Sequence, residues 1–304
     1  MPVRADKVTR GLVLGGVGLT ALYTLLISGA DAITKQFAAH YAAPQLFALS
    51  GALVALFCVI ASRGGGAASA GLRTSCPLAM ALRAGATVLG TIAFFHAFRL
   101  LPFAEVFLFI ALIPLLAALL SGPALSERVG TRAWIALTFG TLGVLCVFHE
   151  GLSGIGKGHA LAFAAVVLGA VSMVTSRYIG QRDSGLLAQV FYPNLALMVA
   201  MGLALPFVYT PMAAQDLGWA VMYAVLLFGA RWVLVAALRT MPAHVVTPLM
   251  NLQFVWMVVI GVLVFGEVPD MAIVLGAGLM LMAGIWLVLD QPLLSASDTT
   301  VPAE

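Results

Sequence analysis

Long apolar stretches alternate with short polar ones along almost the whole chain. Each stretch between charges, prolines and glycine clusters predicts a helix of about 20 residues, the length that crosses a hydrocarbon core of roughly 30 Å. The ten predicted spans are residues 11–30, 44–62, 78–98, 104–124, 132–149, 158–178, 186–209, 217–238, 246–265 and 271–289. Residues 291–304 are small and polar and are predicted to form a disordered tail. The pattern therefore predicts an all-α integral membrane protein with ten transmembrane helices.

The composition agrees with a lipid-facing surface. Of the 304 residues 62% are hydrophobic and only 9% are charged, whereas soluble proteins carry about 25% charged residues. A net charge of +3 gives no reason to expect a nucleic-acid partner. The scattered cysteines Cys58, Cys76 and Cys146 lack the spacing of a metal site or a disulfide framework, and no cofactor is expected.

The basic residues predict an orientation. With the N-terminus in the cytoplasm of a bacterial cell, the segments facing inward hold eleven of the 15 Lys and Arg residues. These are Arg4, Lys7, Arg10, Arg63, Arg73, Arg83, Arg128, Arg132, Arg177, Arg182 and Arg239. The outward segments hold Lys35, Arg99 and Lys157, and Arg231 lies inside a span. The positive-inside rule thus favours ten spans in the inner membrane with both termini cytoplasmic. The first apolar run is too long for a signal peptide and is read as a retained span.

The chain contains an internal repeat. Residues 97–102 (AFRLLP) recur at 237–242 (ALRTMP), an offset of 140 residues that also relates Glu127 to Glu267. The duplication divides the chain into residues 1–150 and 151–290, each with five spans. An odd number of spans makes the second half enter the membrane from the opposite side, which predicts an inverted-topology repeat.

The same residues carry a resemblance to a known family. Residues 97–148, from "AFRLLPFAEVFLFIALIPLLAALLSGPALSERVG" onward, and residues 237–289, from "ALRTMPAHVVTPLMNLQFVWMVVIGVLVFGEVPD" onward, resemble the two EamA domains of the drug/metabolite transporter superfamily. The resemblance covers roughly residues 11–290 and implies a non-enzymatic transporter. The first span, "LLISGADAITKQFA", is similar to that of members that import riboflavin, S-adenosylmethionine or similar metabolites. Leu49-Ser50-Gly51 stands where those members often carry an aromatic–Arg pair.

Polar residues of the first span fall on one helical face. Thr24, Ser28, Asp31 and Lys35 are spaced i, i+4, i+7 and i+11. An ionised group at mid-bilayer costs at least about 2.5–3.5 kcal/mol, which makes such residues candidates for function. The stripe is predicted to line a substrate pathway. Alternatively, Asp31 and Lys35 form an i, i+4 pair at the outer interface, with Lys35 snorkelling.

Three further charged or titratable residues are pathway candidates. Arg231 lies about 10 Å deep at 1.5 Å per residue and needs an anionic partner, water or substrate; the alternative is a structural tie to a neighbouring helix. Glu105 lies just inside the fourth span, where a carboxylate is able to carry a coupling proton, or to pair with Arg99 at the rim. His96 is either a pathway residue or a hydrogen-bonded packing residue.

Prolines predict a broken helix in each half. Pro114 falls in the fourth span and Pro248 in the ninth, and such breaks are frequent at the binding sites of transporters. His244, Thr247 and Asn251 share a face near the second break. Tyr192 is a further pathway candidate or an interface aromatic. Structural roles are predicted for Arg99, Pro102, Pro114, Glu127, Arg239, Pro242, Pro248 and Glu267, with the two glutamates as helix caps or loop anchors.

No Walker A motif, HExxH motif or channel filter sequence is present. The sequence therefore predicts a secondary transporter that moves a small polar metabolite, of amino-acid, vitamin or nucleoside type, by alternating access. Coupling to a proton and facilitated diffusion both remain open. Gly11 and Gly15 are predicted to permit close packing within the chain rather than to form a dimer motif, and a homodimer remains an open alternative. The alternatives are a membrane scaffold or sensor without transport, and an intramembrane enzyme.

Overall fold

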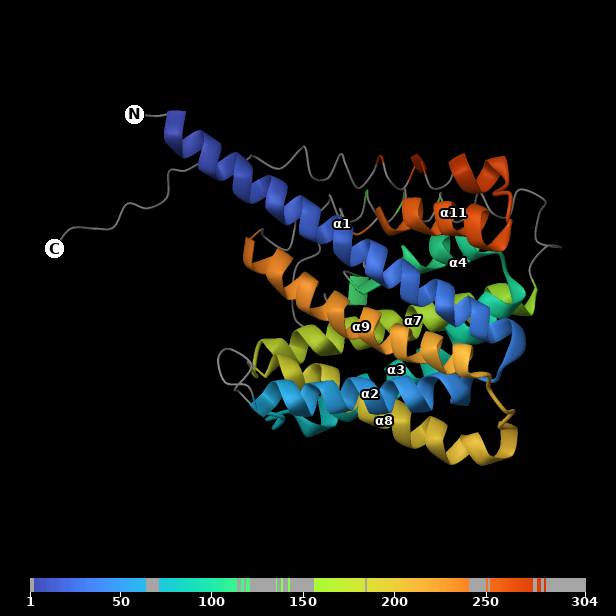
Figure 1. Ribbon diagram of the computed structural model, residues 1–304. Coiled ribbons are helices and arrows are strands. Elements are labelled where there is room, and N and C mark those ends of the chain that lie inside the picture. Colours follow the sequence, from blue (N-terminus) through green and yellow to red (C-terminus); the bar gives the residue numbers. More distant parts are fainter. Residues whose placement is uncertain are drawn as a thin grey trace.

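The computed structural model describes residues 3–63, 71–113, 156–183, 185–240, 250 and 252–275, together with isolated positions between 116 and 142 and between 278 and 282. Of residues 3–14, 186 and 235–240 it describes the backbone only. The described helices lie roughly side by side in one bundle (Figure 1). They are α1 (Val3–His40), α2 (Ala43–Arg63), α3 (Pro77–Leu100), α4 (Phe103–Ile110), α7 (Lys157–Gly180), α8 (Leu186–Val208), α9 (Ala214–Thr240) and α11 (Leu252–Phe265).

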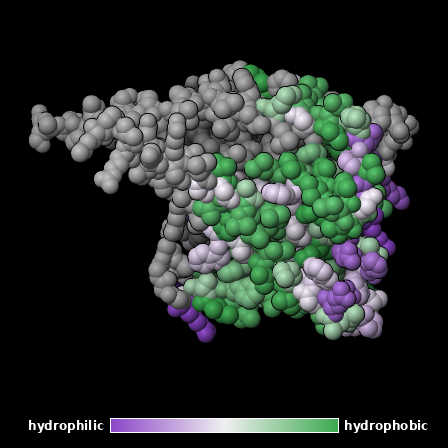
Figure 2. Space-filling view, turned by 45° about the horizontal axis from the view of Figure 1, so that its top comes forward, coloured by the Kyte–Doolittle hydropathy of each residue, from purple (hydrophilic) through white to green (hydrophobic). Residues whose placement is uncertain are grey.

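Six of these helices are long and apolar enough to cross a membrane, within the described part of the chain: α1, α2, α3, α7, α8 and α9. They coincide with the first, second, third, sixth, seventh and eighth predicted spans. Their outer faces are apolar, with Leu203 71% and Phe207 87% exposed. In Figure 2 hydrophobic residues cover the side of the molecule and hydrophilic ones gather toward one edge, as expected for a surface that lipid surrounds.

The end predicted for the first span, residue 30, is wrong. Helix α1 continues to His40, so Lys35 lies inside a helix and not in a connecting segment. The polar residues after residue 30 did not end the helix because neighbouring helices supply their hydrogen-bond partners, as described below.

The fourth and ninth predicted spans are represented by α4 and α11, and most of the fifth and tenth lies outside the described residues.

The packing pairs helices that are far apart in sequence. Helix α1 packs against α9, α2 against α8, α3 against α7, and α4 against α11. The contact between α2 and α8 requires a glycine, because a Cβ at Gly51 would lie 2.8 Å from the carbonyl oxygen of Asn194. Small residues permit such close approach of membrane helices.

Prolines fix the turn between α3 and α4. Helix α3 ends before Leu101, whose extended conformation (φ −124°, ψ 153°) is the one favoured for a residue before proline, here Pro102. Helix α4 then ends at Ile110, four residues before Pro114. A proline in a helix has no N–H to donate to the carbonyl four residues before it, so a helix is expected to break at this position. A break in this predicted span is therefore observed, although Pro114 itself lies outside the described residues.

Hydrogen bonds tie the helical hairpins together at one end of the bundle. The Tyr41 hydroxyl, between α1 and α2, donates to Asp216 at the start of α9 (2.6 Å). The side chains of Gln45 and Thr210 join the same two hairpins, because the Gln45 amide donates to the Thr210 carbonyl (2.7 Å) and the Thr210 hydroxyl donates to Gln45 Oε1 (2.9 Å). The hydrogen bond from its phenol to Asp216 raises the pKa of Tyr41.

At the opposite end, Asp183 joins the segments that follow α2 and α7. Its carboxylate accepts from the backbone N–H groups of Ser75 (2.9 Å) and Gly185 (2.9 Å). These two bonds stabilise the charged form and lower the pKa of Asp183.

Candidate functional site

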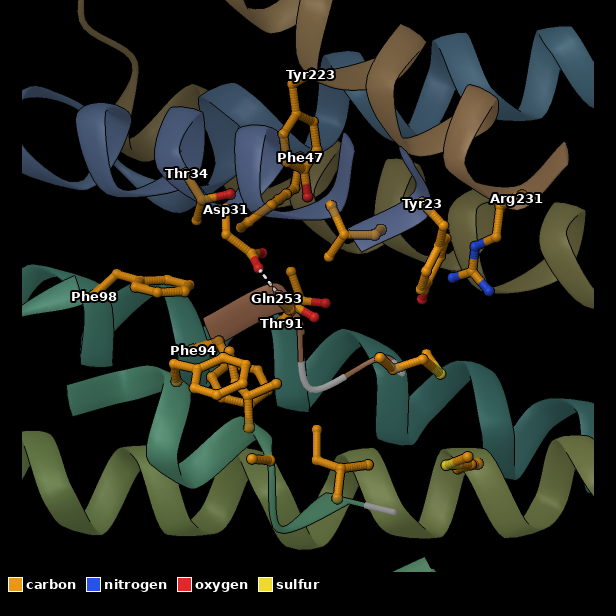
Figure 3. A pocket seen from close by; sticks show the side chains of 17 residues that line it. Tyr23, Asp31, Thr34, Phe47, Thr91, Phe94, Phe98, Tyr223, Arg231 and Gln253 are labelled. Carbon is orange, nitrogen blue, oxygen red and sulfur yellow. Dashed lines mark hydrogen bonds between the residues drawn. The ribbon is translucent and has the colours of Figure 1, made fainter. Parts of the chain in front are cut away.

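A cavity of about 390 Å³ lies between α1, α2, α3, α4, α7, α9 and α11. Its wall is largely aromatic and aliphatic, and its charged side chains are Asp31 and Arg231, among described residues. Figure 3 shows both side chains projecting into this hollow, with Phe47, Phe94 and Phe98 on its walls. The cavity is large enough for a small metabolite, and its lining offers one group of each charge.

Asp31 is held by an amide and not by a cation. Its carboxylate accepts from Gln253 Nε2 of α11 at 2.9 Å (Figure 3). The Ser28 hydroxyl donates to the Gln253 carbonyl oxygen at 3.3 Å, which fixes the two helices at this level. Within the described part of the chain Asp31 has no counter-ion, and its carboxyl group faces the cavity.

The predicted stripe on α1 faces α11 along its length. Besides the two contacts of Gln253, the Trp256 indole donates to Thr24 Oγ1 (3.1 Å), and Lys35 pairs with Glu267 just beyond the end of α11. Thr24 and Ser28 are fully buried. Of the stripe's four residues only Asp31 lines the central cavity.

Arg231 connects the central cavity to a second one. The second cavity, of about 270 Å³, lies between α3, α7, α8 and α9. Arg231 lines both, together with Thr91, Phe94, Ile113 and Tyr223. Arg231 is exposed and has no hydrogen-bond or ion-pair partner among the residues that the structure describes.

The second cavity contains an arginine that the sequence reading did not select. Arg83 of α3 is only 8% exposed, lines the second cavity, and donates from one terminal nitrogen to the Ser172 carbonyl oxygen at 3.3 Å. Its Nε atom is buried without a hydrogen-bond partner. The basic-residue count had assigned Arg83 to the inner end of the third span, and its burial was the missing information.

Lys35 and Glu267 form the centre of a second polar site, at the end of the bundle. The Lys35 ammonium pairs with Glu267 and donates to the Leu101 carbonyl oxygen (3.1 Å). The other carboxylate oxygen of Glu267 accepts from the Phe103 N–H at the start of α4 (2.8 Å). Gly266, at φ +65°, ends α11 in the left-handed conformation that favours glycine and leads into Glu267.

Glu105 pairs with His159 and not with Arg99. The Glu105 carboxylate lies 2.5 Å from His159 Nε2, while His159 Nδ1 accepts from the Gly156 N–H at the start of α7 (3.1 Å). Because Nδ1 is an acceptor, Nε2 carries the proton of a neutral imidazole and donates to Glu105. The Arg99 pairing offered for Glu105 is therefore wrong, and Arg99 is exposed at the end of α3.

The remaining predicted pathway residues lie away from the two cavities or outside the described residues. His96 is exposed on α3, and Tyr192 packs beside the small buried cluster of Met80, Ile179 and Ala188. Pro102 precedes α4, as described above. The residues outside the description are Pro114, Glu127, Pro242, His244, Thr247, Pro248 and Asn251, together with the side chain of Arg239. Among the described residues no group of three or more His, Cys, Asp or Glu side chains is arranged to hold a metal ion.

Comparisons with known proteins identify the class of the molecule. Residues 156–289 match the model of the EamA-like transporter family. A crystal structure of a protein with 19% sequence identity superposes with a TM-score of 0.64, covering 90% of this chain and 96% of that one, which supports the fold alone. No curated protein matches the sequence significantly.

Members of the EamA-like family are typically transporters and not enzymes. Transporters cross the membrane, which agrees with the long apolar helices of this chain. The comparisons give the fold and the activity but name no substrate. Residues 156–289 therefore form an EamA-like transporter family domain, of the drug/metabolite transporter superfamily, within a multi-pass membrane protein.

Proposed function

We propose that the protein is a secondary carrier that moves a small polar or zwitterionic metabolite across the bacterial inner membrane by alternating access. The observation that carries the proposal is the central cavity. Asp31 and Arg231 face it from two different helices, and neither has a counter-ion among the described residues. A charged group inside a membrane protein without a charged partner is costly, and a substrate group of opposite charge reduces that cost.

An inverted repeat of two five-helix halves, residues 1–150 and 151–290, accounts for the packing between the halves, although the α1–α3 contact within the first half has no equally extensive counterpart between α7 and α9. In such a repeat α7 corresponds to α1, α8 to α2, α9 to α3 and α11 to α4. When each helix is replaced by its counterpart, the α1–α9 contact becomes the α7–α3 contact. It likewise turns α2–α9 into α8–α3 and α1–α11 into α7–α4. All six contacts are made, and the α2–α8 and α4–α11 contacts map onto themselves. This exchange symmetry supports a pseudo-two-fold axis, which is the architecture of carriers that rock about a central site.

The polar ties at one end supply a gate for that motion. Lys35 belongs to the first proposed half and Glu267 to the second, and Tyr41–Asp216 and Gln45–Thr210 also join the two halves. Arg231, by contrast, lies toward the far end of α9 and is exposed. We propose that the structure is a state closed at the Lys35 end, and that transport requires these ties to break. With both termini cytoplasmic, the closed end is the outer one.

Proton coupling, if present, is assigned to Asp31 and not to Glu105. Asp31 lines the cavity, where a substrate and a proton compete for one carboxylate. Glu105 lines neither cavity and is already bonded to His159.

The proposal is tested in two steps. Ligands are first found by a thermal-shift screen of the purified protein against metabolites, because a ligand that binds only the folded state stabilises it. Uptake of a ligand found in this way is then measured in vesicles for Arg231→Ala. We expect uptake to fall to the level of empty vesicles while the amount of protein in the membrane stays normal. Arg63→Ala, at the exposed end of α2, is the control, and normal uptake by Arg231→Ala would remove Arg231 from the site.

A further inference from the structure

We infer that the second cavity, between α3, α7, α8 and α9, is an anion subsite in which Arg83 and Arg231 together hold an acidic group of the substrate. The inference rests on the proposed carrier function and adds the chemical class of the cargo. It starts from Arg83, a residue that the function proposed above does not use.

The burial of Arg83 leaves donors unused. A guanidinium offers five N–H donors. One terminal nitrogen of Arg83 reaches the Ser172 carbonyl oxygen (3.3 Å), and the Nε group is buried without any acceptor. A buried N–H without a partner costs about 1–3 kcal/mol. The planar fork of an arginine fits a carboxylate or phosphate through two parallel hydrogen bonds, so an oxyanion in the cavity would satisfy it.

The two hydroxyl groups beside Arg83 have already used their protons. The Thr87 hydroxyl donates to the Arg83 carbonyl oxygen (2.8 Å). Ser172 Oγ lies 3.0 Å from Thr87 Oγ1 and therefore donates to it. The Asn194 amide donates to the Val190 carbonyl oxygen (2.8 Å). The second N–H of Asn194 and the amide of Gln189, whose Oε1 accepts from Ser176 (2.6 Å), leave neutral donors in the same wall. The donors that also carry a positive charge belong to the arginines.

The charge of the second cavity is positive and uncompensated. Arg83 and Arg231 both line it, and no Asp or Glu does so among the described residues. Two like charges around one hollow repel each other, and an anion between them replaces that repulsion by two attractions. Asp31 does not supply this anion, because it lines only the first cavity and is bonded to Gln253.

The two cavities adjoin along the residues that they share, with Phe94 and Tyr223 at the junction. A substrate that extends through both would place its acidic group at Arg83 and Arg231, its apolar body against the aromatic rings, and a cationic or hydrogen-bond-donating group at Asp31. The substrate class is therefore an amphoteric small molecule whose acidic group is a carboxylate or a phosphate.

The subsite is tested without knowledge of the substrate. Full-length protein is purified in detergent, and its thermal unfolding is followed while sodium phosphate, sulfate or acetate replaces chloride at constant ionic strength. We expect a saturable rise of the melting temperature. In Arg83→Gln the half-saturating concentration should increase about tenfold or more, as the loss of a charge-assisted hydrogen bond predicts, and Arg83→Lys should recover part of the effect. Arg99→Gln, which removes an exposed charge from the same helix, should behave as wild type.

Arg231→Gln provides a second test if Arg83→Gln fails to fold. Arg231 is exposed, so its replacement should be tolerated by the fold, and the variant should weaken anion binding to a similar extent. Stabilisation by phosphate or sulfate alone indicates a phosphate-bearing cargo, and stabilisation by acetate as well indicates a carboxylate. A wild type whose melting temperature ignores all three anions, or an Arg83→Gln variant with unchanged half-saturation, would overturn the subsite.

Substrate exchange in vesicles separates this inference from the proposed function. A metabolite that is transported equally well by Arg83→Gln, or whose carboxamide is transported as well as its acid, refutes the subsite and leaves the carrier intact. Anion binding at Arg83 with no exchange of any metabolite that stabilises the protein refutes the carrier and leaves the subsite intact.

Discussion

The closed end of the bundle and the cavities at its centre both contain charged side chains, but only at the closed end do these have both hydrogen-bond and ion-pair partners within the described part of the protein. At the end, Lys35 pairs with Glu267 and also bonds the Leu101 carbonyl, while Glu267 accepts from the Phe103 N–H as well. In the cavities, Arg83 retains an unpaired N–H, and Arg231 has no hydrogen-bond or ion-pair partner within the described residues. The first site is complete by itself, and the second is complete only with a ligand.

This difference separates structural charges from functional ones. A charge whose bonds are all made inside the protein holds helices together, and its removal is felt in stability. A charge whose bonds are left open contributes little to stability, and its removal is felt in binding. Variants at the closed end should therefore change mainly the free energy of unfolding, and variants in the cavities should change mainly ligand binding.

Among the variants that compare these two regions, the largest effect is expected for Asp31→Asn on transport. The amide keeps the size of the side chain but cannot carry a negative charge, and the loss of one charge-assisted hydrogen bond of about 2 kcal/mol to a substrate corresponds to roughly 30-fold weaker binding. Uptake in vesicles and ligand affinity from thermal shifts measure it. Asp183→Asn is the matched control, since it neutralises a carboxylate that lies outside both cavities and away from the closed end, and its uptake should stay within about twofold of wild type. An equal loss in both variants would contradict the separation.

The next effect is expected for the Lys35–Glu267 pair on stability. Both side chains are largely buried, at 14% and 25% exposure, so their coupling should be about 1–3 kcal/mol. Lys35→Met, Glu267→Gln and the double variant form a cycle that isolates this pair. Glutamine at 267 retains an oxygen for the Phe103 N–H, which keeps the start of α4 intact. Additive losses of melting temperature in the double variant would mean that the ion pair contributes nothing.

A smaller and pH-dependent effect is expected at Asp183, near the opposite end. Because its folded pKa is lowered by the N–H groups of Ser75 and Gly185, the charged form is favoured by folding. Its contribution is fully present above the unfolded pKa of about 3.9 and is lost as the pH falls through the lower folded pKa. The melting temperature of the wild type should therefore fall toward that of Asp183→Asn below about pH 4. A difference between the two that persists down to pH 2 would refute this role.

The sequence predicted the charges more readily than their partners. Arg231 and Asp31 stand out as charges within or beside apolar runs, and the structure places both at one cavity. Lys35 and Glu267 were each selected, but they are 232 residues apart, and no periodicity within one helix indicates which distant helix will supply a partner.

Two cavity residues were missed for physical reasons. Arg83 lies six residues after Pro77, the first residue of α3, so a basic-residue count assigned it to the membrane surface. Six residues of helix rise about 9 Å, which is enough to bring it between neighbouring helices. Gln253 carries no charge and therefore gave no signal, although its amide holds Asp31 in place. Hydropathy predicts where helices lie, whereas their neighbours determine which polar groups remain free.

The smallest effect is expected for Tyr41→Phe at the closed end. The phenol donates to Asp216 at 2.6 Å, and this bond raises the pKa of Tyr41, so folding favours the protonated form. The bond therefore contributes fully below the unfolded pKa of about 10 and is lost as the pH rises through the higher folded pKa. Because the group is near the surface, the decrease in melting temperature at pH 7 should be smaller than that of Lys35→Met. The gap between wild type and Tyr41→Phe should close at strongly alkaline pH, in the direction opposite to that expected for Asp183. If the gap instead stayed constant from pH 7 to pH 11, the hydrogen bond to Asp216 would not be what distinguishes the two proteins, and the closed end would depend on Lys35, Gln45 and their partners alone.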